Sequence, residues 1–269
     1  MKIPFTKAHG ARNDFLLTWA WQGPRENLPA VARAICDRHT GIGADGWLLV
    51  KPAGPEAPGC DGSIRLFNAD GSEAEISGNG TRCAAAFLID AGVARDQVRI
   101  LTGAGAKHLR LIERQELKFR FEMNMGRPEC GGEQLRVRLE LRGGACEVTV
   151  VDVGNPQCAL FVEEFPTHWQ ELAAEIEGHP YFPRRTNVSL VRVVDRHTLE
   201  VRFFERGVGE TMSSGTGSTG AVVAAVRRGL AESPVTVLTP AGPLELRWED
   251  EVYLVGPAEI VAGGEFYIG

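Results

Sequence analysis

The sequence predicts an α+β protein, mixed α/β in its order of elements, made of two pseudo-symmetric halves. Three observations predict this class: short alternating segments typical of strands, two helices that are apolar on every side, and a motif that occurs twice. We expect each half to be a curled, mostly antiparallel sheet around one central buried helix.

The strands are predicted by segments in which apolar and polar residues alternate. The clearest of these segments cover 118–123, 198–203 and 244–248. A period of two is typical of strands with one face in the core. Further β-rich runs lie near 15–20, 46–50, 97–102, 148–153 and 187–194, and 32 glycines and 15 prolines supply the turns between them.

Four segments predict helices, over 29–38, 79–91, 166–176 and 216–228. In the second and the fourth, the middle is almost entirely small or apolar, and a glycine follows at position 92 or 229. Glycine commonly ends a helix, and a helix without a polar face is buried. We therefore expect these two helices at the centres of the two halves.

A repeat supports the two halves. The segment from Phe67 matches the segment from Phe204, with a glutamate, a serine and a Gly-x-Gly in the same register. The serines are Ser77 and Ser214. The predicted halves are 1–115, completed by a C-terminal strand over 260–269, and 116–259, with a boundary near 113–116.

Composition narrows the function classes. The net charge is −6, from 29 basic and 35 acidic residues without a long basic cluster, which argues against nucleic acid as a partner. No apolar run approaches the roughly 20 residues of a membrane span, and the first residues lack the apolar core of a signal peptide. Six widely spaced cysteines predict reduced thiols in the cytoplasm. The histidine spacings predict no metal site.

Each Ser-Gly-x-Gly comes directly before a buried helix. The N–H groups of a first helical turn have no partner within the helix, and together with the helix dipole they favour an anion. Two such sites would place Ser77 and Ser214 on opposite sides of one small anionic ligand. Inverting a carbon centre requires one group to remove a proton from one face and another to supply one to the opposite face. Helix N–H groups would stabilise the enediolate charge, so no cofactor is required.

The strongest motifs together resemble the diaminopimelate epimerases, which are pyridoxal-independent racemases and isomerases. They lie at 37–45 (DRHTGIGAD), 67–73 (FNADGSE), 78–82 (GNGTR), 154–156 (GNP), 185–188 (RTNV) and 205–211 (ERGVGET). The resemblance runs from Lys2 to the C-terminus. It implies two similar α/β halves with the active site in the cleft between them, and conversion of LL- to meso-diaminopimelate in lysine and cell-wall biosynthesis. The expected partner is this small-molecule amino acid, and the expected assembly is a homodimer.

The resemblance also implies the roles of individual residues. The residues that match the family's ligands of the distal carboxylate are Asn68, Asn187 and Arg206. Their chemistry suits this role, because arginine offers a bidentate fork and asparagine donates from a fixed position. Glu205 would lie near the distal ammonium. The full implied set of substrate ligands is Asn13, Asn68, Gly78, Asn79, Asn155, Asn187, Glu205, Arg206, Gly215 and Thr216.

The chain departs from the family at its two base positions. The family has catalytic cysteines there, whereas this chain has Ser77 and Ser214 as the candidate catalytic residues. A hydroxyl is far less acidic than a thiol and usually needs an adjacent base. Other departures are Arg12, Gly46 and Gln157. Cys83, inside the apolar helix, is interpreted as structural.

Three explanations of the serines stay open. The first is that the serines were introduced to trap a substrate complex. The second is that the chain is a natural homologue with altered chemistry, and the third is that it binds an amino acid without turnover. An altered chemistry would be that of a dehydratase or an isomerase that needs only one strong base. The sequence therefore predicts an epimerase-type isomerase, with a divergent enzyme or a binding protein as the alternative.

Overall fold

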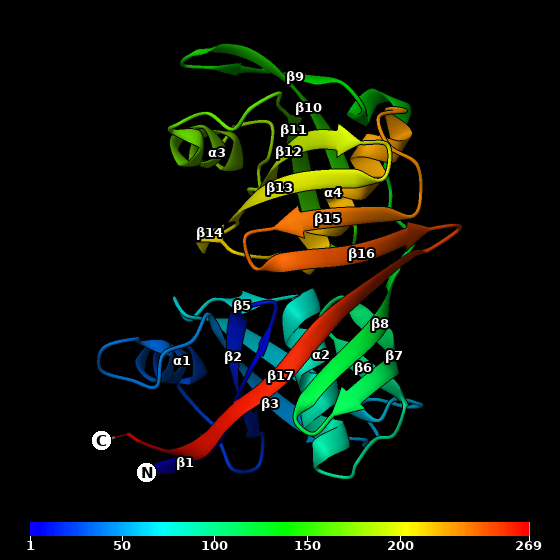
Figure 1. Ribbon diagram of the computed structural model, residues 1–269. Helices are drawn as coiled ribbons and strands as arrows, with labels where there is room; N and C mark the ends of the chain where they lie inside the picture. The colour runs from blue at the N-terminus through cyan, green and yellow to red at the C-terminus, as the bar shows by residue number, and fades with distance from the viewer. Residues whose placement is uncertain (269) are drawn as a thin grey trace. The chain divides into compact units, whose positions relative to one another are not determined.

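The computed structural model describes residues 1–268. They form two compact units, the first made of residues 1–124 and the C-terminal segment from Gly256, the second of Met125–Val255. The colours of Figure 1 follow the chain through both units.

The first unit is a sheet that closes around helix α2 (Gly78–Asp90). Neighbouring strands are antiparallel except β2 with β3 and β4 with β6, which are parallel. The long last strand, β17 (Val252–Tyr267), pairs with both β1 and β8 and so completes the ring. The other strands are β1 (Lys2–Gly10), β2 (Asn13–Trp19), β3 (Gly46–Pro52), β4 (Gly62–Asn68), β5 (Glu73–Ala74), β6 (Gln97–Thr102), β7 (Gly105–Gln115) and β8 (Lys118–Gly126).

The second unit repeats this order around helix α4 (Gly215–Arg227). Its parallel pairs, β11 with β12 and β13 with β15, correspond to β2 with β3 and β4 with β6. Its remaining neighbours are antiparallel, as in the first unit. The strands are β9 (Val137–Leu141), β10 (Gly144–Asp152), β11 (Pro156–Phe161), β12 (Asn187–Asp195), β13 (Thr198–Glu205), β14 (Gly209–Thr211), β15 (Val235–Thr239) and β16 (Gly242–Trp248), with a short 3₁₀ turn at Gly132–Gln134. The predicted α+β class with two pseudo-symmetric halves is confirmed.

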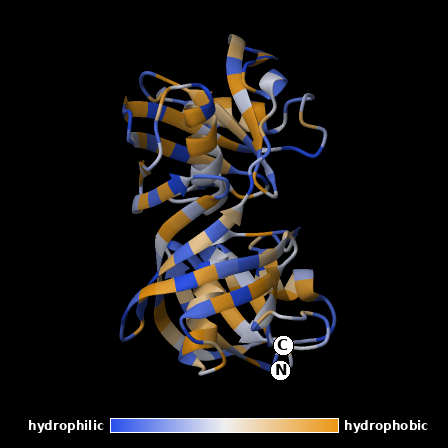
Figure 2. Ribbon diagram, turned by 90° about the vertical axis from the view of Figure 1, so that its right-hand side faces the viewer, coloured by the Kyte–Doolittle hydropathy of each residue, from blue (hydrophilic) through white to orange (hydrophobic). Residues whose placement is uncertain are grey.

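The two outer helices occupy equivalent places in the order of elements. Helix α1 (Leu28–Cys36) joins β2 to β3, and α3 (Trp169–Glu177) joins β11 to β12. Each packs an apolar face on its own sheet: Ile35 of α1 joins a cluster with Trp47 and Phe67, and Ile176 of α3 joins one with Leu190. Figure 2 shows the matching alternation of apolar and polar residues along the strands.

The central helices have the burial that their sequences predict. Helix α2 is buried from Gly78 to Ile89, and α4 from Gly215 to Ala225. Small residues are required here because the strands approach closely: a Cβ added at Gly217 would lie 2.8 Å from the Phe203 ring. Since overpacking of a core costs stability, the small-residue composition follows from the enclosure.

The division between the units differs from the prediction in two places. The predicted boundary near 113–116 falls at the turn between β7 and β8, and the first unit continues to Asn124 because β8 pairs with β7 and β17. The returning C-terminal segment joins the first unit from Gly256 rather than from residue 260. None of the helices within residues 1–268 has the length and apolar character to span a membrane.

Candidate active site

Ser77 and Ser214 cap the two central helices in the same way. Both have an extended backbone, with φ near −129° and −134°. The Ser77 hydroxyl accepts a hydrogen bond from the Gly80 N–H at 3.1 Å, and the Ser214 hydroxyl accepts one from the Gly217 N–H at 3.0 Å. Serine is among the preferred N-cap residues because its oxygen replaces a missing helical acceptor.

The first turn of each helix is the place where an anion would bind. Gly78 and Asn79 begin α2, and Gly215 and Thr216 begin α4; all four are buried. The first N–H groups of a helix have no carbonyl partner within it, and the positive end of the helix dipole adds to their pull on a negative charge. Each unit therefore holds one half-site suited to a carboxylate or to an enediolate oxygen.

Among the described residues, Ser214 donates a hydrogen bond to a carboxylate of its own unit, whereas Ser77 does not. The Ser214 hydroxyl donates to Glu205 Oε1 at 2.7 Å, from the N-cap of α4 to the end of β13. In the repeat, Asn68 takes the place of Glu205, and its side-chain amide donates to the Ser72 hydroxyl at 3.0 Å. Among the described residues of the first unit, no carboxylate accepts from Ser77. The hydrogen bond between Ser214 and Glu205 was not predicted from the sequence, although both residues lie in the repeated segment that begins at Phe204.

Two predicted ligands of the second unit, Asn187 and Arg206, are connected next to this pair. Asn187 accepts the backbone N–H of Arg206 at 3.0 Å and donates to the Pro156 carbonyl at 2.9 Å. Arg206 directly follows Glu205 and donates through its guanidinium to the Arg184 carbonyl at 3.3 Å. Separately, Asn155 accepts from the Gln157 amide at 2.7 Å.

The predicted ligands of the first unit are linked through Asp45, the last residue of the 37–45 motif. Asn13 donates to Asp45 Oδ2 at 2.7 Å and accepts from the Asn79 amide at 3.1 Å. The next residue after Asn68, Ala69, donates its backbone N–H to the Asp45 carbonyl at 3.0 Å. The structure thus joins Asn13 to Asn79 directly, and it places Ala69, the neighbour of Asn68 in the chain, on the same aspartate.

Charged groups hold this aspartate in place. Arg38 contacts Asp14 at 2.7 Å and Asp45 at 2.8 Å, and Lys7 contacts Asp14 at 3.1 Å. Burial, reinforced by the neighbouring Asp14 charge, raises the pKa of Asp45. Burial would also raise the pKa of Asp14, but the hydrogen bonds from Arg38 and Lys7 outweigh it and lower that pKa.

Cys83 is buried where it cannot act as a nucleophile. Cys83 is fully buried inside α2, and burial raises the pKa of its thiol to about 12. A thiol of this kind stays protonated at neutral pH and packs as a small apolar side chain.

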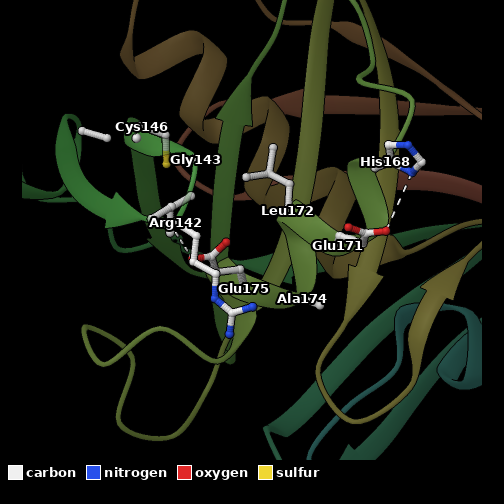
Figure 3. Close-up of a pocket in the computed structure, with 11 residues that line it drawn as sticks. Arg142, Gly143, Cys146, His168, Glu171, Leu172, Ala174 and Glu175 are labelled. Atoms are coloured by element: carbon white, nitrogen blue, oxygen red, sulfur yellow. Dashed lines mark hydrogen bonds and ion pairs between the residues drawn. The ribbon is translucent and has the colours of Figure 1, made fainter.

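A surface hollow in the second unit lies apart from the predicted residues. Figure 3 shows it between the turn of the β9–β10 hairpin and α3, with Arg142, Cys146, Leu172 and Glu175 among its walls. Its volume is about 700 Å³, and no predicted site residue lines it. Within residues 1–268, no cluster of three His, Cys, Asp or Glu side chains is arranged to hold a metal ion.

Comparisons with known proteins agree with this arrangement. The family model of diaminopimelate epimerase matches residues 5–130 and 149–261. Proteins named diaminopimelate epimerase from Pelotomaculum thermopropionicum and diaminopimelate epimerase 1 from a Nostoc species are each 40% identical to this chain. The first match covers 97% of this chain and 98% of the relative, and the second covers 98% and 100%.

Solved structures share the fold at low identity. A probable proline racemase from Agrobacterium radiobacter superposes with a TM-score of 0.77 at 14% identity, covering 97% of this chain and 92% of that one. A PhzF-family phenazine biosynthesis protein from Bacillus anthracis gives a TM-score of 0.70 at 14% identity, with both chains covered completely. The family model and the relatives, matched over nearly the whole chain, confirm the resemblance seen in the motifs: the chain belongs to the diaminopimelate epimerase family.

Proposed function

We propose that this chain is a cofactor-independent isomerase that removes the α-proton of LL-diaminopimelate from one face and supplies a proton to the opposite face. The observation that carries the proposal is the hydrogen bond from the Ser214 hydroxyl to Glu205 at 2.7 Å. A serine by itself is a poor base, but a serine with an adjacent carboxylate has a proton acceptor at hand.

The proposed proton removal at the half-site of Ser214 needs no cofactor. Ser214 Oγ takes the α-proton while its own proton passes to Glu205 Oε1, so the C–H bond breaks and the carboxylate becomes neutral. The electron pair left on the α-carbon spreads into the substrate carboxylate as an enediolate. The N–H groups of Gly215 and Thr216 at the start of α4 would stabilise that charge.

The remaining predicted residues supply binding. Arg206, Asn187 and Asn68 would hold the distal carboxylate, and Asn13 and Asn155 would add amide donors. Gly78 and Asn79 would complete the donors to the proximal carboxylate. Glu205 is assigned to Ser214 in this proposal, in addition to the place near the distal ammonium that the resemblance implies.

Ser77 would serve the opposite face of the α-carbon, where its hydroxyl would pass a proton to the carbanion and regain one from solvent. It has the same helix cap as Ser214 but no carboxylate acceptor within the described residues of its own unit. This difference favours a second candidate function, in which a proton is removed from one face only, as in an isomerase or dehydratase with a single strong base.

The test is proton exchange in deuterated water. Incubation with LL-diaminopimelate, followed by ¹H NMR of the α-proton and by chiral chromatography, separates the candidates. Deuterium at the α-carbon together with meso product supports the epimerase. Deuterium without the meso product supports the one-face reaction, and binding without exchange identifies a protein that only binds the amino acid.

The proposal extends to the cellular setting. We place the reaction in lysine and cell-wall biosynthesis in the cytoplasm, where the six unpaired cysteines would stay reduced. A homodimer is proposed as the assembly, and sedimentation equilibrium measures it.

A further inference from the structure

Arg82 is a buried cation one turn into α2. Its side chain is fully buried, and burial lowers its pKa to about 10, so that it stays protonated at neutral pH. Its Nε donates to the Pro257 carbonyl of β17 at 3.1 Å, and a second nitrogen donates to Asn79 Oδ1. Within residues 1–268 its third nitrogen has no hydrogen-bond partner. A buried charge without a carboxylate costs stability, so its presence needs a reason.

The reason lies in a directed chain of hydrogen bonds. A guanidinium only donates, so Asn79 must present its oxygen to Arg82 and turn its NH₂ toward Asn13. Asn13 accepts at 3.1 Å and in turn donates to Asp45 at 2.7 Å. Asp45 is a carboxylate, which as an anion only accepts. The cation at one end and the carboxylate at the other therefore fix which way both amides face.

We propose that Arg82 is a positioning residue that orients the Asn79 amide and, through it, the amide of Asn13 as a donor to the substrate carboxylate. The inference rests on the proposed function, which makes these asparagines substrate ligands. A carboxylate only accepts, so an amide that presented its oxygen would repel it. Arg82 touches no substrate in this proposal and acts through the two amides.

The last strand offers a way to disturb Arg82 without touching a ligand residue. A Cβ added at Gly256 would lie 2.9 Å from the Arg82 guanidinium carbon. The backbone of Gly256 is not in the left-handed region, so alanine is compatible with the strand. The guanidinium is the far end of a flexible side chain and would move away from Asn79. Gly263 on the same strand is the matched control, because its added Cβ meets its nearest atom at 3.6 Å.

The experiment measures the affinity for LL-diaminopimelate by calorimetry in Gly256→Ala, Gly263→Ala, Arg82→Lys and the double variant Gly256→Ala/Arg82→Lys. We expect Gly256→Ala to bind roughly tenfold more weakly, the scale of a lost outer hydrogen bond, and Gly263→Ala to bind as the unaltered protein does. Lysine is slimmer and relieves the contact with the new Cβ, so the double variant should bind no more weakly than Arg82→Lys alone. Such non-additivity shows that the glycine acts through Arg82.

Side-chain amide NMR gives a readout that needs no ligand. The ¹⁵N–¹H signals of Asn13 and Asn79 should move in Gly256→Ala and stay in place in Gly263→Ala. Equal affinities in the two alanine variants, additive effects in the double variant, or unmoved amide signals would each overturn the inference. If the unaltered protein does not bind LL-diaminopimelate, the proposed function fails. The amide signals still decide whether Arg82 orients the side-chain amides of the two asparagines.

Discussion

Glu205→Gln tests the chemistry most directly. The substitution keeps the length of the side chain and an oxygen that accepts from Ser214, but an amide does not take up a proton at neutral pH. In the structure this oxygen lies 2.7 Å from the serine hydroxyl, within the 2.6–3.2 Å that proton transfer needs. The geometry is therefore retained while the proton acceptor is lost.

The expected loss follows from the contribution of a positioned base. General base catalysis typically supplies about 10²–10⁴ in rate, or about 2.7–5.4 kcal/mol at 1.36 kcal/mol for each factor of ten. We expect α-deuterium incorporation into LL-diaminopimelate to slow by this factor. The thermal midpoint should change little, because the glutamine oxygen still accepts from Ser214.

The assay follows the initial loss of the α-proton signal in deuterated water. Glu210→Gln is the matched control, since Glu210 lies on neighbouring β14 and its carboxylate accepts from Gln170 at 3.0 Å rather than from Ser214. The control should exchange at the rate of the unaltered protein. If Glu205→Gln and Glu210→Gln exchange equally fast, Glu205 is not the proton acceptor and the base has to be another group.

Three further expectations concern binding, acidity and stability. Arg206→Ala should weaken the binding of LL-diaminopimelate by about 1.5–3 kcal/mol, the range for charged hydrogen bonds. Calorimetry that shows the same loss of affinity for free lysine, an amino acid without the distal carboxylate, contradicts the assignment. Replacing Ser77 and Ser214 together by cysteine should raise exchange by orders of magnitude, because a thiol has a pKa near 8.5, far closer to neutral pH; an unchanged rate argues against acidity as the limit. The pKa of Glu73 is lowered by its hydrogen bonds to Arg65, so this stabilisation is present above about pH 4.5 and is lost as the pH falls through the folded value. Glu73→Gln should therefore lower the free energy of unfolding by roughly 0.2–1 kcal/mol at pH 7. Below the folded pKa of Glu73, the variant and the unaltered protein should be equally stable in urea unfolding.

Local patterns in the sequence predicted the elements well. The central helices begin and end within about a residue of their predicted limits, because a serine cap and a glycine stop mark both ends. Helix α3 starts at Trp169 rather than at 166, since the Trp169 N–H first closes a turn to the Pro166 carbonyl at 3.1 Å. The division between the units was misplaced because it depends on β8 pairing with β17, a contact between distant parts of the chain.

The candidate site was predicted in its residue types but not in its pairings. The resemblance supplied Asn13 as an implied substrate ligand and Asp45 as the last residue of the 37–45 motif, with no link between them. Their contact depends on the parallel pairing of β2 with β3, which sets Phe15 opposite Gly46 and so brings the preceding residues together. The same limit applies to Glu205 and Ser214, which are nine residues apart and meet only because β13 ends beside the start of α4.

The duplicated fold gives two equal helix starts, but the strands before them end in different side chains. Strand β4 ends at Asn68, an amide that can donate to an anion but cannot take up a proton, whereas β13 ends at Glu205, a carboxylate that can. The first unit adds further donors, with Asn13 and Asn79 oriented from the Arg82 cation. On the proposed function, both units hold the anionic substrate, but only the second has a proton acceptor beside its serine. Binding and exchange then become separable: changes at Arg206 should alter the affinity, and changes at Glu205 should alter the rate at which bound substrate exchanges.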